Sequence, residues 1–139
     1  MTRAAHFEGF RSLILPPLES FDSDVPLNGD GTIRRSSYVI VHDLGADDPP
    51  DDERYTAPQT AASRVTYRYV TKSVGLTPFA AREVDDKVAA NVVGGTVAVA
   101  GRVCDPIVRD EVGDVKQDTD TSPPLYFIES DYLLTSSPA

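Results

Sequence analysis

The sequence predicts a single α+β domain, residues 1–139, in which a mostly antiparallel sheet of four to five strands packs with one main helix and a short N-terminal helix. Residues 63–73 alternate between two faces, as in a strand with one buried side. Thr77-Pro78 can open a helix that Gly94-Gly95 ends. Valine accounts for 16 of the 139 residues, and β-branched residues favour strands.

The N-terminal third begins with a predicted short helix over residues 4–15, because four apolar side chains recur at helical spacing before Pro16-Pro17 ends the segment. Residues 19–37 are expected to be irregular, with a tight turn at 28–31. Residues 37–44 predict a strand that is apolar on both faces, and residues 45–62 predict a long acidic loop.

The remaining elements follow from similar patterns. The Thr77–Val93 helix keeps one face of small apolar residues. Strands are expected within 96–112 and from Leu125 to Leu134. A second acidic loop is predicted at 113–122. Runs of strands around one well-capped helix are typical of an α+β domain.

Charge is unevenly distributed along the chain, whose net charge is −9. Residues 1–53 carry −7, residues 54–102 carry +4, and residues 103–139 carry −6. A basic middle and acidic flanks could provide two different complementary faces, as a head-to-tail ring requires. The alternative is that the acidic loops serve solubility alone. Either way, an acidic chain is poorly suited to holding nucleic acid through its phosphates.

Several classes of protein are not favoured. No apolar run approaches the roughly 20 residues of a membrane helix, and no secretion signal is recognisable at the N-terminus. Cys104 is a single cysteine in an apolar stretch, so a disulfide or thiolate metal site is not expected. His6 and His42 lack partners at metal or catalytic spacing. We therefore predict a non-enzymatic protein without a metal or another cofactor.

One strand face offers a candidate contact between subunits. Arg64, Arg68 and Lys72 follow one another on the face of residues 63–73 that lies opposite the predicted core. They could meet an acidic surface of another chain, or they could simply form a solvated strand edge. No aromatic residue shares that face, which argues against a platform for stacking bases.

The two acidic loops offer candidate lumen or partner-docking residues. Residues 47–53 contain five acids and two prolines, so this run is expected to be solvated and mobile in the free subunit and to order on binding a partner. The spacing of acids in the second loop does not match a calcium loop of the EF-hand kind. The candidates are Asp47, Asp48, Asp51, Asp52, Asp114, Asp118 and Asp120.

Four stretches together resemble the tail terminator proteins of long-tailed bacteriophages, in particular those infecting actinobacteria. The resemblance spans roughly residues 26–137, and the order of predicted elements also fits. The N-terminal part departs from it, because terminators often open with a longer helix. The stretches are Tyr38-Val-Ile-Val-His42, Arg54-Tyr-Thr-Ala-Pro-Gln59 with Val65-Thr-Tyr-Arg-Tyr-Val70, Val99-Ala-Gly-Arg-Val-Cys-Asp-Pro106, and Asp118-Thr-Asp-Thr-Ser-Pro-Pro-Leu-Tyr126.

This resemblance implies a structural virion protein at the head–tail junction, assembled in the bacterial host cytoplasm. Such a subunit forms a hexameric ring that ends growth of the tail tube and joins the tail to the head-completion, or stopper, protein. Its partners would be further copies of itself, the major tail tube protein and that connector. DNA would pass through the lumen without specific binding.

Three alternatives stay open. The nearest is a head-to-tail stopper or another neck-ring protein, although those resemble small β-barrels and the Thr77–Val93 helix argues against one. An enzyme acting on a small molecule lacks a convergent acid–base pair. A monomeric regulatory or inhibitor domain would be distinguished from a ring former by its oligomeric state in solution.

Overall fold

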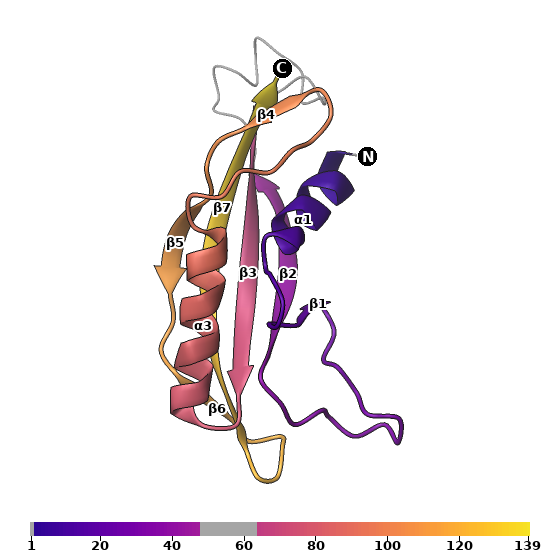
Figure 1. Cartoon of the computed structure of the whole chain (residues 1–139), viewed down its shortest axis with the longest axis vertical. Helices are drawn as coiled ribbons and strands as arrows, with labels where there is room; N and C mark the ends of the chain where they lie inside the picture. The colour runs from indigo at the N-terminus through magenta and orange to yellow at the C-terminus, as the bar shows by residue number, and fades with distance from the viewer. Residues whose placement is uncertain (1, 48–63) are drawn as a thin grey trace.

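The computed structural model describes residues 2–47 and 64–139 of the chain, which form two helices and a mixed sheet of seven strands (Figure 1). The fold is therefore α+β, as predicted. The elements, in chain order, are α1 (Thr2–Ser12), β1 (Ser20–Asp22), β2 (Tyr38–Asp47), β3 (Val65–Gly75), α3 (Pro78–Val92), β4 (Arg102–Cys104), β5 (Val108–Val112), β6 (Lys116–Asp118) and β7 (Leu125–Pro138).

Two long strands organise the sheet. β3 lies between β2 and β7 and is antiparallel to both, with Tyr69 paired to Tyr132 near the middle of the β3–β7 register. The short strand β1 is parallel to β2 at one edge. At the other edge β4, β5 and β6 all pair with β7, antiparallel and at different points along its length. The sheet is thus mostly antiparallel, as predicted.

Both helices pack on the same face of the sheet and form the main core (Figure 1). The ring of Phe10 from α1 lies 4.6 Å from that of Tyr69 and 5.8 Å from that of Tyr132, measured between centroids. Val88 of α3 is fully buried in the same cluster. The other face carries no helix among the described residues; its core is a smaller cluster at one end, made by Tyr38, Ile40, Val74 and Leu125.

Local sequence accounts for the main helix. Thr77 is its N-cap, since its side chain accepts a hydrogen bond of 3.0 Å from the backbone N–H of Ala80, and Pro78 takes the first helical position. Gly94 follows the C-cap with a φ of +79°, a conformation that suits glycine. The predicted cap and stop are both confirmed.

Three expectations about the sheet were wrong. It has seven strands where four to five were expected. The predicted loop 113–122 contains β6, which pairs with the first residues of β7, and the predicted irregular segment 19–37 begins with β1. Each missed strand has three residues, which is too short for an alternating pattern to appear. The last strand also runs beyond Leu134, to Pro138.

Candidate interaction surfaces

The predicted basic stripe lies on the helix-free face of β3, with the alternation that the sequence indicated. Arg64 is exposed just before the strand. Arg68 is half-buried, and its guanidinium lies 2.8 Å from a carboxylate oxygen of Asp110 and 3.3 Å from one of Asp131. The ammonium of Lys72 stands 4.3 Å from the ring centroid of Phe127.

These contacts reduce the number of cations in the stripe that are available to another chain. Two of its three cations already have partners within the same chain, and the β7 residues opposite Val70 and Lys72 are Asp131 and Glu129. β5 adds Asp110 and Glu111 beside them. The helix-free face therefore mixes both signs of charge. Among the described residues neither Arg64 nor Lys72 forms an ion pair, and Arg64 is the exposed one of the two.

The candidate acidic residues separate into different places. Asp114 is exposed after β5, whereas Asp118 ends β6 and pairs with Leu125. The side chain of Asp118 accepts a 3.0 Å hydrogen bond from the backbone N–H of Asp120, which shapes the turn before β7. Asp47 is the last residue of β2. The predicted loop 45–62 begins too early, because residues 45–47 belong to β2. The rest of that loop, with the expectation that it is mobile and the candidates Asp48, Asp51 and Asp52, lies outside the described residues.

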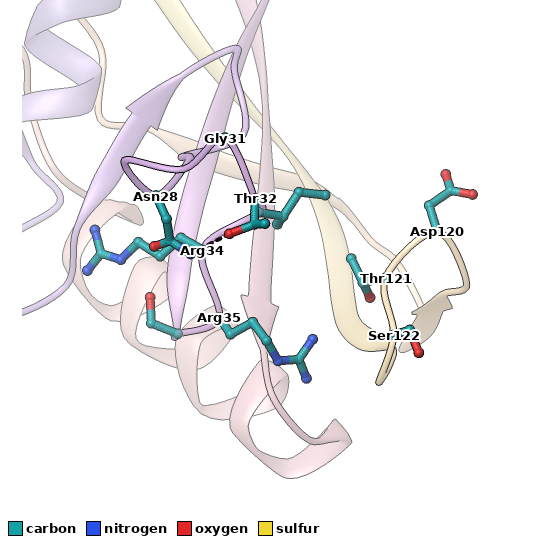
Figure 2. A pocket seen from close by; sticks show the side chains of 10 residues that line it. Asn28, Gly31, Thr32, Arg34, Arg35, Asp120, Thr121 and Ser122 are labelled. Carbon is teal, nitrogen blue, oxygen red and sulfur yellow. Dashed lines mark hydrogen bonds between the residues drawn. The ribbon is translucent and has the colours of Figure 1, made fainter.

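A cleft of about 860 Å³ lies between the segment after β1 and the loop between β6 and β7 (Figure 2). Arg35 extends toward the second wall, where its guanidinium donates a 2.6 Å hydrogen bond to the carbonyl of Pro123. Arg34 extends the opposite way, toward its ion-pair partner Glu19. Eight of the ten residues that line the cleft are polar: Asn28, Thr32, Arg34, Arg35, Ser36, Asp120, Thr121 and Ser122, with Gly31 and Ile33.

Both walls of this cleft are held by hydrogen bonds of their own. The hydroxyl of Thr32 donates to Asp30 at 2.6 Å and accepts from the side-chain amide of Asn28 at 3.0 Å. Across the cleft, the hydroxyl of Thr121 donates to the carbonyl of Asp118 and accepts from the backbone N–H of Leu125. The hydrogen bond to Asp30 lowers the pKa of that carboxyl. Each wall is thus held by side-chain hydrogen bonds within its own segment.

Sequence patterns did not reveal the polar network beneath α3. Asp85 is buried on the inner face of the helix and forms an ion pair with Arg109 of β5. The hydroxyl of Ser130 in β7 donates a 2.9 Å hydrogen bond to Asp85 and accepts one of 3.1 Å from Arg109. The sequence did hold one sign of this network: Asp85 lies between Val84 and Val88 and interrupts an otherwise apolar helix face.

A second buried polar contact ties α1 to the sheet. His6 is fully buried, its Nε2 lies 2.8 Å from the hydroxyl oxygen of Ser136, and its ring stacks on Tyr67 at 4.4 Å. Arg102 of β4 donates to the same hydroxyl at 2.9 Å. Since the hydroxyl oxygen accepts from Arg102, its own proton is available to His6. This histidine acts as a packed core residue.

A comparison of the sequence with protein-family models and with curated proteins found no match. Within residues 2–47 and 64–139 no helix is long and apolar enough to cross a membrane. In the same part of the chain, no group of three or more His, Cys, Asp and Glu side chains is arranged to hold a metal ion.

Proposed function

We propose that this chain is the tail terminator of a long-tailed bacteriophage, a structural subunit of a ring that caps the finished tail tube and joins it to the head. The ring is proposed to be a hexamer, and DNA passes through its lumen without specific binding. The partners are further copies of the chain, the tail tube protein and the head-completion protein.

The observation that carries this proposal is the agreement between the fold and the resemblance. The resemblance over residues 26–137 implies a small α+β subunit, and the chain folds as an α+β domain. Helices α1 and α3 on one sheet face support a terminator over a head-to-tail stopper, which resembles a small β-barrel.

The chemistry of the surface is compatible with this role. The described residues bring together no triad of metal-ligating side chains, and the cleft beside Arg35 is lined mostly by polar residues and held by loop hydrogen bonds. The net charge of −9 disfavours attraction to phosphates, which suits a channel through which DNA must slide. A surface built for contacts with other proteins accounts for these features better than a catalytic pocket does.

The experiment is a length assay on tail tubes. Tube protein from the same virus is allowed to polymerise with and without the purified chain, and tube lengths are measured by electron microscopy. We expect the chain to bind one end of each tube and to stop further growth, with ring-shaped density at that end. Tubes that keep growing in a molar excess of folded protein would contradict the proposed function.

A further inference from the structure

An exposed Asn-Gly pair lies in the loop between β1 and β2. Residues 28–31 form a tight turn, in which the N–H of Gly31 donates a 3.0 Å hydrogen bond to the carbonyl of Asn28. The N–H of Asn28 in turn donates one of 2.8 Å to the carbonyl of Thr32. Asn28 and Gly29 are both exposed, so water reaches the side-chain amide of the asparagine and the backbone beside it.

The two residues of such a pair can react with each other. The backbone nitrogen of Gly29, once it has lost its proton, attacks the side-chain carbonyl carbon, Cγ, of Asn28. A bond forms between that nitrogen and Cγ, the bond from Cγ to Nδ2 breaks, and Nδ2 takes up a proton and leaves as ammonia. Water then opens the succinimide ring, giving aspartate by attack at Cγ or isoaspartate by attack at the backbone carbonyl. Glycine favours ring closure because it has no Cβ to hinder the approach.

The other asparagine of the chain has a very different setting. Asn91 lies in α3, where helical hydrogen bonds fix its backbone, and the residue that follows it is the buried Val92. A side chain branched at Cβ crowds the nitrogen that would have to attack. Asn91 is therefore an internal reference for an unreactive asparagine.

The neighbouring Asp30-Gly31 pair could form the same ring, but two contacts oppose it. The N–H of Gly31 is engaged with the carbonyl of Asn28, whereas the N–H of Gly29 donates no hydrogen bond within the described part of the chain. The hydroxyl and the N–H of Thr32 both donate to Asp30, which lowers the pKa of that carboxyl and keeps it ionised. An ionised carboxylate resists attack by a nucleophile. The reaction is thus expected at Asn28.

The hydroxyl of Thr32 holds the reactive amide. It accepts a 3.0 Å hydrogen bond from Nδ2 of Asn28 (Figure 2) and donates one of 2.6 Å to Asp30. Ring closure rotates the Asn28 side chain, and Nδ2 is the group that leaves. The hydrogen bond from Nδ2 to Thr32 must therefore break on the way to the succinimide.

We propose that Asn28 is a site of spontaneous deamidation and that Thr32 slows the reaction as a positioning residue. The proposal does not depend on the proposed function. The product places a second carboxylate beside Asp30, and the one hydroxyl proton of Thr32 can serve only one of the two. Asn28 and Thr32 line the cleft beside Arg35, so deamidation adds a negative charge to that wall and removes one of its hydrogen bonds.

The test follows both asparagines of the purified full chain by peptide mapping with mass spectrometry, during incubation in a mildly alkaline buffer. We expect slow deamidation at Asn28 in the wild type. Thr32→Val keeps the volume and removes the hydroxyl, and it should deamidate at Asn28 about fivefold faster, a factor that one ordinary hydrogen bond accounts for. Thr121→Val removes a hydroxyl from the other wall of the cleft and should react at the wild-type rate.

Two further measurements separate the effect of the fold from that of the local sequence. In concentrated urea, where the hydrogen bond to Thr32 is absent, the wild type and Thr32→Val should deamidate at the same rate. Gly29→Ala has room for the added methyl group, since nothing lies within 4 Å of a Cβ there. It should slow deamidation in the folded and the unfolded chain alike, because the methyl group hinders ring closure.

Three results would overturn the proposal. If Asn28 reacts no faster than Asn91 in Thr32→Val, the turn is not a deamidation site. Equal rates for the folded wild type and Thr32→Val would show that the hydrogen bond does not restrain the amide. A faster reaction of Thr32→Val that persists in urea would assign the difference to the local sequence and not to the fold.

Discussion

Asp85 of α3 and Arg109 of β5 form an ion pair beneath the main helix, and Ser130 of β7 bonds to both. The side chain of Asp85 is only 5% exposed, while that of Arg109 reaches the surface at 24%. Among the described residues, β5 is an edge strand of five residues that pairs only with β7. This pair therefore connects the helix to the edge of the sheet as well as to its centre.

Replacing Asp85 should lower the stability of the fold more than an ordinary substitution at the surface does. We expect Asp85→Ala to lower the free energy of unfolding by about 3 kcal/mol, because Arg109 would keep its charge without a buried partner. The double variant Asp85→Leu/Arg109→Met should lose less stability than Asp85→Leu or Arg109→Met alone, since it removes both charges and keeps the volume. Urea titrations of the wild type and the four variants measure these differences. Simple additivity of the two single effects would contradict this account.

Much of the fold could be predicted because it depends on local patterns. The alternation in β3 correctly placed Tyr67 and Tyr69 in the core, and Thr77-Pro78 correctly started α3. Three-residue strands could not be predicted in the same way. β6 exists because β7 offers it an edge, and β1 exists because β2 does. Pairing at a distance leaves no periodic trace in so short a segment.

The candidate surfaces were less predictable, for a related reason. Arg68 has the sequence context of an exposed cation, but its charge is matched by Asp110 and Asp131, which are 42 and 63 positions away. The cleft likewise needs Arg35 to reach Pro123, 88 positions later. Which charges meet is fixed by the register of β3, β5 and β7, and no spacing within one segment encodes that register.

Gly75 ends β3 where the chain turns into α3, and its lack of a side chain allows the turn. A Cβ there would lie 2.5 Å from the nitrogen of Ala81 and 2.7 Å from the carbonyl carbon of Ala80, both backbone atoms. We expect Gly75→Ala to destabilise the fold by about 1–3 kcal/mol through overpacking. Gly29→Ala is the control, because nothing lies within 4 Å of a Cβ there. Equal melting temperatures for the two variants would refute the steric argument.

Buried tyrosines should make the fold sensitive to alkali. Burial raises the pKa of Tyr132 from an ordinary value of 10 to about 12, and burial also raises the pKa of Tyr69. Because the unfolded chain loses these protons first, stability is fully present below about pH 10 and falls as pH rises toward 12. For Tyr132 alone the loss of stability approaches about 3 kcal/mol. Chemical denaturation across this pH range measures it.

Substitutions of single tyrosines show which side chain causes the loss of stability at alkaline pH. Tyr132→Phe removes one ionisable group and should make the decline in stability above pH 10 less steep, while the part that Tyr69 contributes remains. Tyr126→Phe, at a half-buried position on the same strand, is the matched control for loss of a tyrosine hydroxyl. If both variants decline as steeply as the wild type, ionisation of Tyr132 does not limit stability in alkali.

Arg64 and Arg68 should respond differently to charge reversal, although they lie four residues apart on one sheet face. Arg68→Glu places a third carboxylate beside Asp110 and Asp131, so we expect the free energy of unfolding to fall by about 2 kcal/mol. Arg64 is exposed, and Arg64→Glu should change stability by no more than about 0.5 kcal/mol.

Ring formation should depend on Arg64 more than on Arg68, although Arg64 contributes less to the stability of the monomer. If Arg64 meets an acidic surface of the next subunit, Arg64→Glu weakens ring formation while the monomer melts as the wild type does. Exchanging the partners of the internal pair, as Arg68→Glu/Asp110→Arg, should restore part of the stability lost in Arg68→Glu, because the opposite charges again face each other. Sedimentation velocity with and without tail tubes, beside thermal melts, separates the two effects. Normal rings from Arg64→Glu would show that this arginine belongs to a solvated strand edge.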